Sequence, residues 1–152
     1  MSILVCGGAG YIGAHVVRLL RQRGDRVVVV DDLSTSNAAR VGDTPLVRLD
    51  VATDEARSTL STLMMDEDVT AVIHFSARKQ VGESVKRPAW YYAQNIGGMA
   101  NVLAAMEDAG VDQMIFSSSA AVYGIPTAEV VTEDMAGHPI NPYGETKLIG
   151  EW

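Results

Sequence analysis

Near one end of the sequence a tyrosine and a lysine, Tyr143 and Lys147, stand four positions apart. Asn141 and Pro142 before them are typical of a helix start, with asparagine as the N-cap and proline at the first helical position. On such a helix Tyr143 and Lys147 share one face. A phenol, with an ordinary pKa of about 10, acts as a base at neutral pH only as a stabilised phenolate, which a lysine and a helix N-terminus favour. The pair therefore indicates proton transfer, although alone it would be typical of a surface helix.

A serine, Ser119, is the third candidate for chemistry. It closely follows the apolar run at 113–117, which is predicted to be a strand. Its hydroxyl could hold the oxygen of a reacting carbinol by a hydrogen bond while Tyr143 removes the proton. Such chemistry requires a fold that brings Ser119 to the helix of Tyr143 and Lys147.

Short, β-branched apolar runs are predicted to be the strands of that fold, at 3–6, 27–30, 45–49, 71–75 and 113–117. Most are separated by segments with helical spacing. Strands that are apolar on both faces and alternate with helices imply a parallel sheet covered on both sides. The predicted fold class is therefore α/β, a doubly wound parallel sheet with strand order 3-2-1-4-5, and a flavodoxin-like order is the alternative.

The helical segments carry their own signals. In the first, the apolar residues expected on one face are Ile12, Val16, Leu19 and Leu20. Thr53, which is followed by acidic residues, is predicted to cap the second helix. A longer helix is expected to begin after Pro88 and to run towards Gly110. His74, in the fourth strand, is expected to be a core residue whose hydrogen bonds are satisfied.

A glycine loop joins the first strand to the first helix. Gly7, Gly10 and Gly13 follow the spacing G-x-x-G-x-x-G. At such a junction glycine permits a tight turn, close approach of the backbone to a pyrophosphate, and close packing of helix on strand. Backbone N–H groups and the positive helix end then bind phosphate without a basic side chain. The loop therefore predicts a dinucleotide site.

Charged residues at later strand ends extend this site. Asp31, at the end of the second strand, could accept hydrogen bonds from the adenosine ribose and would repel a 2′-phosphate, which favours NAD over NADP. Asp50, after the third strand, could meet the adenine amino group. Lys79, beyond the fourth, could reach the ribose or phosphates. Taken alone, Asp50 would more often be a helix cap and Lys79 a solvated lysine.

The bulk composition limits the possible partners. The chain has 152 residues, the length of one domain, and a net charge of -7, which argues against nucleic acid or an anionic membrane surface as a partner. Cys6, the single cysteine, cannot form an intrachain disulfide, so a cytoplasmic location is expected. Clusters of His, Cys and carboxylates with metal-ligand spacing are not found, and no metal is expected.

These motifs together resemble the extended short-chain dehydrogenase/reductase superfamily and, in detail, its UDP-glucose 4-epimerases. The resemblance covers essentially the whole chain and rests on VCGGAGYIGAH, DDLS, VIHFSARKQVGESVKRP, YYAQN, FSSSAAVYG and NPYGETK. It implies a Rossmann domain with NAD as cofactor and interconversion of UDP-glucose and UDP-galactose through a 4-keto intermediate. NAD would be regenerated within each cycle.

The glycine loop and the resemblance together imply two sets of site residues. The catalytic residues would be Ser119, Tyr143 and Lys147. The cofactor-binding residues would be Gly7, Gly10, Tyr11, Ile12, Gly13, Asp31, Asp32, Leu33, Ser34, Thr35, Ser36, Asp50, Val51, Phe75, Ser76, Lys79 and Asn95.

The resemblance also implies that members of this family continue beyond the length of this chain. Residues 1–152 are then expected to be an incomplete NAD-binding domain without the C-terminal domain that grips the UDP-hexose, and inactive alone. The full-length form is expected to be a homodimer. The alternatives are another nucleotide-sugar epimerase or decarboxylase of the superfamily, and a noncatalytic NAD-binding module.

Overall fold

The structure, a computed structural model of the chain, describes residues 1–127 and 129–152. Within these residues, five parallel strands form one sheet: β1 (Ser2–Cys6), β2 (Arg26–Asp31), β3 (Leu46–Arg48), β4 (Ala71–His74) and β5 (Met114–Phe116). Their spatial order is β3-β2-β1-β4-β5. This order confirms the predicted doubly wound sheet and excludes the flavodoxin-like alternative.

The helices follow the strands in the expected alternation. They are α1 (Tyr11–Gln22), α2 (Ala56–Asp66), α3 (Val81–Lys86), α4 (Pro88–Tyr92), α5 (Gly98–Ala109) and α6 (Pro142–Glu151), with 3-10 turns at Ala38–Val41 and Ala120–Tyr123. A π-helical turn, Ala93–Gly97, joins α4 to α5. The predicted long helix is thus confirmed, and it ends at Gly110 in the left-handed conformation. Among the described helices, none is long and apolar enough to cross a membrane.

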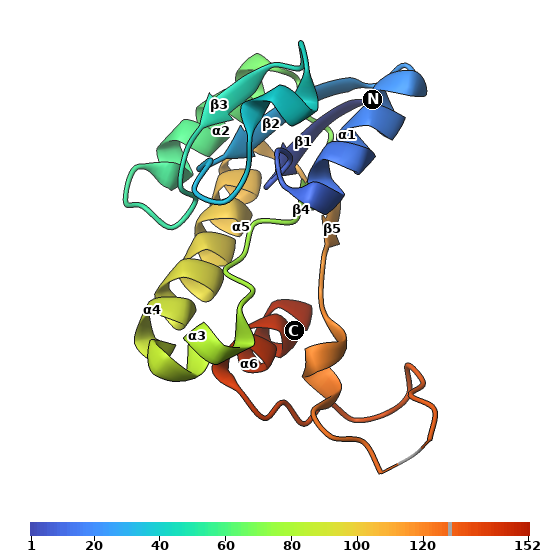
Figure 1. Cartoon of the computed structure of the whole chain (residues 1–152). Helices are drawn as coiled ribbons and strands as arrows, with labels where there is room; N and C mark the ends of the chain where they lie inside the picture. The colour runs from blue at the N-terminus through green and yellow to red at the C-terminus, as the bar shows by residue number, and fades with distance from the viewer. Residues whose placement is uncertain (128) are drawn as a thin grey trace.

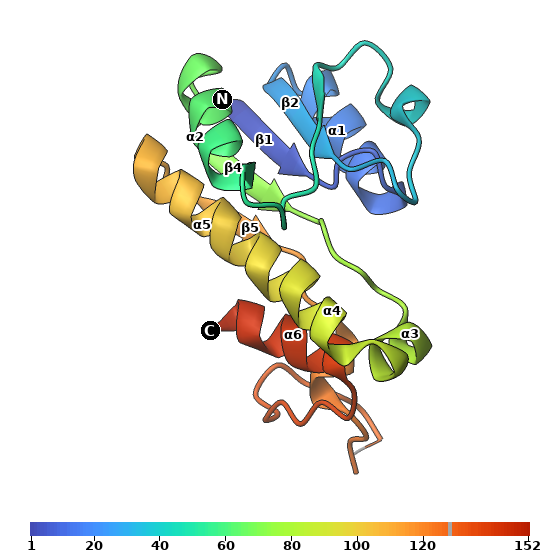
Figure 2. The ribbon, with the colours of Figure 1, turned by 90° about the vertical axis from the view of Figure 1, so that its left-hand side faces the viewer.

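Two apolar layers hold the helices on opposite faces of the sheet. Figures 1 and 2 show α1 on one face and α2 with α5 on the other. Alternate residues of β1 serve the two layers, because successive side chains of a strand point to opposite faces. Val5 packs in the layer with Val17 of α1, whereas Leu4 packs with Leu60 of α2 and Val102 of α5. Each such fully buried side chain contributes about 1.5–3 kcal/mol.

The inward face of α1 matches the prediction at Val16 and Leu20 but not at Ile12 and Leu19. Gly13, Val17 and Leu20 are buried, whereas Ile12 and Leu19 are each 58% exposed. Gly13 lies against the glycine loop, and this contact sets the rotation of the helix about its axis. The residue with no side chain therefore faces inward in place of the larger Ile12.

The start of α2 also differs from the prediction. The helix begins at Ala56, with Glu55 at the cap position and no capping hydrogen bond from its side chain. The Thr53 hydroxyl instead donates to the carbonyl oxygen of Asp50 at 2.9 Å. Thr53 therefore stabilises the turn after β3 and does not cap the helix.

The glycine loop brings α1 against the end of the sheet. A Cβ atom on Gly13 would lie 2.3 Å from the carbonyl oxygen of Gly7 and 2.7 Å from Cα of Gly8. One on Gly7, whose φ is 76°, would lie 2.7 Å from the backbone nitrogen of Ser76. Because the blocking atoms belong to the backbone, they cannot yield as a flexible side chain would. These glycines are therefore required for the close packing of β1, α1 and the segment after β4.

We expect the substitution Gly13→Ala to lower the free energy of unfolding by more than about 2 kcal/mol, because the added methyl group forces backbone atoms apart. Gly82→Ala is the control, since Gly82 lies in α3 with nothing within 4 Å of its added Cβ. It should raise stability by about 0.5–1 kcal/mol through reduced chain entropy. Urea denaturation of both variants measures the difference. Equal stabilities would contradict the close contact at Gly13.

Candidate functional site

A cleft of about 430 Å³ lies at the carboxyl ends of the strands. Crevices at this edge of a doubly wound sheet are where such folds bind ligands. The predicted site residues that line it are Gly7, Gly10, Tyr11, Ile12, Gly13, Asp31, Asp32, Ser34, Thr35, Ser36, Asp50, Val51, Phe75, Ser76, Lys79, Asn95, Ser119, Tyr143 and Lys147. Residues outside the two predicted sets also line it, namely Leu49, Ala77, Arg78, Gln94, Ser117 and Ser118.

Leu33 is the predicted site residue that lies outside the cleft lining. Its side chain is partly buried against the apolar layer beneath α1. Its backbone has a φ of 59°, and its N–H donates to Oδ1 of Asp31 at 2.9 Å. Leu33 therefore shapes the loop after β2, while its side chain belongs to the core.

The glycine loop presents the start of α1 to the cleft. The Gly7 N–H donates to the carbonyl oxygen of Val30 at 2.7 Å, and the Gly10 N–H to that of Gly7 at 3.2 Å. Gly10 is the N-cap of α1 and has no side chain to cover the helix end. The first N–H groups of a helix have no partner within it, so this end attracts an anion.

Asp31 ties the glycine loop to the end of β2. It is only 6% exposed, and its Oδ2 accepts the Ala9 N–H at 3.0 Å. Its Oδ1 accepts the Leu33 N–H and, at 2.6 Å, the Ser36 hydroxyl. Two carboxylate oxygens can accept about four hydrogen bonds, so Oδ2 keeps capacity for one donor from a ligand.

Two further aspartates, Asp32 and Asp50, meet around Arg78. Nη2 of Arg78 lies 2.7 Å from Oδ2 of Asp32 and 3.5 Å from Oδ2 of Asp50. Burial raises the pKa of Asp32, but hydrogen bonds from Ser34 and the charge of Arg78 outweigh it and hold that pKa below its usual range. The sequence offers one signal for Arg78, a basic residue at a strand's carboxyl end, but its partners lie far away in the chain.

Asn95 joins the segment after β4 to α6. Its Oδ1 accepts the Arg78 N–H at 2.8 Å, and its Nδ2 donates to the Arg78 carbonyl oxygen and to the Thr146 hydroxyl, both at 3.0 Å. Three of the four hydrogen bonds open to the amide are thus used within the protein. Asn95 lines the cleft, and these contacts make it a link between the two walls.

The three catalytic candidates come together on one side of the cleft. The predicted cap of α6 is present, because Oδ1 of Asn141 accepts the Gly144 N–H at 2.9 Å. Tyr143 and Lys147 follow on this helix and line the cleft with Ser119. The Ser119 Oγ accepts the Ala121 N–H at 3.2 Å, which leaves its hydroxyl hydrogen for another acceptor.

Lys147 is a buried cation at this end of the cleft. It is 4% exposed, its Nζ donates to the carbonyl oxygen of Ser117 at 2.8 Å, and it lies 4.8 Å from the centre of the Phe116 ring. Burial lowers its pKa to about 8, so the amine stays largely protonated at pH 7. Lys147 therefore provides a positive charge at a fixed position on the helix of Tyr143.

His74 lies buried behind Lys147. Its ring stacks on Phe116, and burial, followed by the charge of Lys147, lowers its pKa to about 4, which keeps the imidazole neutral at pH 7. Within residues 1–127 and 129–152, its buried Nδ1 has no hydrogen-bond partner. His74 is a core residue as predicted, but the expectation that its hydrogen bonds are satisfied was wrong.

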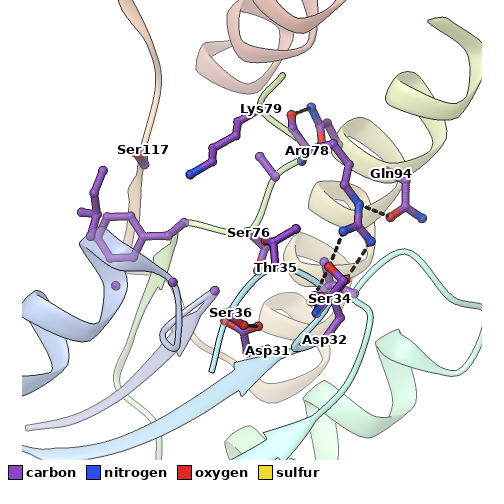
Figure 3. Close-up of a pocket in the computed structure, with 18 of the residues that line it drawn as sticks. Asp31, Asp32, Ser34, Thr35, Ser36, Ser76, Arg78, Lys79, Gln94 and Ser117 are labelled. Carbon is purple, nitrogen blue, oxygen red and sulfur yellow. Dashed lines mark hydrogen bonds and ion pairs between the residues drawn. The ribbon is translucent and has the colours of Figure 1, made fainter. Parts of the chain in front are cut away.

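Lys79 is the exposed cation of the cleft. In Figure 3 its side chain extends into the space between the segments of Arg78 and Ser117. Among the described residues, it makes no ion pair with a carboxylate, so its ammonium group is available to a ligand. Lys79 is thus placed to meet an anionic group within the cleft.

Metal ligands are not grouped in the part of the chain that the structure describes, where no set of three or more His, Cys, Asp or Glu residues could hold an ion. Cys6 is buried in β1, and burial, with a smaller effect from Asp31, raises the pKa of its thiol to about 12. The thiol therefore stays protonated at neutral pH.

Comparison with solved structures shows which proteins share this arrangement. UDP-glucose 4-epimerase from Brucella ovis, crystallised in complex with NAD, has a TM-score of 0.93 and 43% identity, and the match covers 99% of this chain and 45% of that one. The enzyme from Stenotrophomonas maltophila, crystallised with NAD and formylated UDP-arabinopyranose, has a TM-score of 0.92 and 43% identity, with 99% and 46% covered.

Sequence comparison agrees. UDP-glucose 4-epimerase of Lactobacillus helveticus is 47% identical over 151 residues, which are 99% of this chain and 45% of that protein. The chain thus spans a little under half the length of this relative. Residues 3–152 match the family described as Epimerase, the NAD dependent epimerase/dehydratase family. The chain therefore belongs to the NAD dependent epimerase/dehydratase family.

Proposed function

We propose that this chain forms the NAD-binding half of a UDP-glucose 4-epimerase, which interconverts UDP-glucose and UDP-galactose. The observation that carries the proposal is that one cleft is lined by the glycine loop, by Asp31 and by all three catalytic candidates. Relatives of 47% and 43% identity that are UDP-glucose 4-epimerases support the choice of reaction. The UDP-hexose would be held largely by a segment outside residues 1–152.

The residues of the cleft fit NAD. The N–H groups at the start of α1 would bind the pyrophosphate, and Lys79 would add a cation. Asp31 would accept a ribose hydroxyl at its remaining site, and Asp50 would meet the adenine amino group. NADP fits less well, because its 2′-phosphate would meet the carboxylates of Asp31 and Asp32.

The other predicted residues complete the proposed cofactor site. Besides those just named, it would comprise Gly7, Gly10, Tyr11, Ile12, Gly13, Ser34, Thr35, Ser36, Val51, Phe75, Ser76 and Asn95. Leu33 would contribute through its backbone. Formation of a homodimer by the full-length protein and a cytoplasmic location are further proposals, which rest on the resemblance and on the single buried cysteine.

Ser119, Tyr143 and Lys147 would divide the proton chemistry among them. The chemistry that NAD would supply when bound is to accept a hydride from C4 of the hexose and to give it back to the opposite face of that carbon. The Tyr143 phenolate would remove the proton of the C4 hydroxyl, and Ser119 would donate a hydrogen bond to the same oxygen. Lys147, whose ammonium group donates one hydrogen bond to the Ser117 carbonyl oxygen, would stabilise the phenolate through its charge.

The first test separates cofactor binding from chemistry. Residues 1–152 should bind NAD at least about tenfold more tightly than NADP, because like charges across a binding site are unfavourable. Fused to the remaining segment of the Lactobacillus helveticus relative, the chain should interconvert the two UDP-hexoses. Tyr143→Phe should lower turnover by about 10²- to 10⁴-fold, the usual contribution of a general base, and leave NAD affinity unchanged.

Tyr123→Phe is the matched control, because Tyr123 is not among the residues that line the cleft. It should leave both NAD affinity and turnover unchanged. Isothermal titration calorimetry measures the affinities, and a coupled assay measures the turnover. If Tyr143→Phe retained full turnover, the proposed base would be wrong.

The second test uses the buried charge of Lys147. Its pKa of about 8 in the folded protein lies below the ordinary 10.5, so between these values the unfolded state binds more protons and stability rises with pH. Relative to Lys147→Met, the wild-type chain should therefore gain about 3 kcal/mol in free energy of unfolding as pH rises from 7 towards 10.5.

Urea denaturation at intervals from pH 7 to pH 10.5 measures this gain, and contributions from other titrating groups cancel between the two proteins. Lys79→Met is the control, because Lys79 is exposed. The free energy of unfolding of Lys79→Met should change with pH as that of the wild-type chain does. If the free energy of unfolding of Lys147→Met also followed the wild-type pH dependence, the buried charge of Lys147 would be refuted.

A further inference from the structure

Each of the three guanidinium nitrogens of Arg78 donates a hydrogen bond inside the cleft. Nη2 donates to Oδ2 of Asp32 at 2.7 Å, Nη1 to the Ser34 hydroxyl at 2.6 Å, and Nε to Oε1 of Gln94 at 2.9 Å. Nη2 also lies 3.5 Å from Oδ2 of Asp50. Figure 3 shows the side chain turned towards Asp32, Ser34 and Gln94. The Arg78 side chain is 20% exposed, and its contacts with Asp32 and Gln94 are partly buried.

The partners of Arg78 come from three separate parts of the fold. Asp32 and Ser34 follow β2, Asp50 follows β3, and Gln94 lies in the π-helical turn between α4 and α5. The backbone of Arg78 is held in turn by the side chain of Asn95. One side chain therefore connects the loops after two neighbouring strands to the long helix beside them.

The planar fork of arginine suits this role. It presents several N–H donors in fixed directions, whereas a lysine ammonium is a compact charge that cannot match the same set of acceptors. The charge matters as well, because Asp32 and Asp50 meet at one guanidinium. Without it, two carboxylates would face each other beside the subsite proposed for an anionic dinucleotide.

We propose that Arg78 is a positioning residue for the adenosine half of the cofactor. It holds the loops after β2 and β3 in the conformation that frames the adenosine, and it neutralises their two carboxylates. This role rests on the proposed function, since the adenosine lies against these loops only if the cleft binds NAD. Because each of its three guanidinium nitrogens already donates to Asp32, Ser34 or Gln94, Arg78 acts on the ligand through these partners.

The test compares NAD with AMP, which carries only the adenosine end of the cofactor. In the purified chain, Arg78→Met should weaken the binding of both ligands by the same factor, about tenfold, as measured by calorimetry. Arg87→Met is the matched control, because the Arg78 and Arg87 guanidinium groups both lie over the Trp90 ring, at 5.3 and 3.9 Å, but Arg87 is not among the cleft-lining residues. It removes the same charge and should change neither affinity more than about twofold.

A double variant separates the charge from loss of structure. Asp32→Asn combined with Arg78→Met removes one of the two uncompensated carboxylates. The loss of AMP affinity that Arg78→Met causes should therefore be about threefold smaller in the Asp32→Asn background than in the wild-type chain. The loss of AMP affinity in Arg78→Met should also be smaller at 500 mM salt than at 20 mM, a salt concentration about 25-fold lower. The reason is that salt screens the repulsion between the carboxylates and the anionic ligand. A loss of affinity caused only by global unfolding of Arg78→Met predicts neither effect, and thermal unfolding of each variant measures whether it is folded.

Arg78→Lys keeps a cation but lacks the fork, and it serves if Arg78→Met does not fold. It should bind AMP and NAD about threefold more weakly than the wild-type chain. Wild-type affinities in Arg78→Met, or in Arg78→Lys where that variant is used, would overturn the role of Arg78 while leaving the proposed function intact. If the wild-type chain itself bound neither AMP nor NAD, the proposed function would fail, and the role of Arg78 with it.

Discussion

The backbone contact between Gly13 and Gly7 is the constraint on which the cleft depends. At this point a Cβ atom would lie 2.3 Å from a carbonyl oxygen, so α1 reaches β1 only because no side chain intervenes. The contact aims the start of α1 at the carboxyl ends of the strands, and it places the Ala9 N–H against Asp31. The residue proposed to select NAD is thus held by the same loop that would bind the pyrophosphate.

Charge in the cleft is distributed differently from charge in the chain. The chain carries -7 overall, but the cleft is lined by three aspartates, Asp31, Asp32 and Asp50, and by three cations, Arg78, Lys79 and Lys147. The cations have separate environments, since Arg78 is paired with carboxylates, Lys147 is buried on α6 and Lys79 is exposed. An acidic protein can therefore bind an anionic cofactor through backbone N–H groups and one free lysine.

Much of the fold could be predicted because its signals are local. Strands appeared as β-branched runs, and the strand order followed from the handedness of the connections. The cap at Asn141 was also readable from adjacent residues. The start of α2 and two residues of the inward face of α1, Ile12 and Leu19, were predicted wrongly. The reasons are that a turn at Asp50 uses the Thr53 hydroxyl and that a backbone contact at Gly13 sets the helix rotation.

The sequence by itself determined the α/β class, the glycine spacing and the placement of Tyr143 and Lys147 on one face of a helix, because each depends on residues within a few positions of one another. Only the tertiary structure decided that Arg78 meets Asp32 and Ser34, which lie 46 and 44 residues away, and that Asn95 reaches Thr146 across 51 residues. Such contacts carry no local pattern. They form because packing on the sheet brings distant segments within hydrogen-bonding distance.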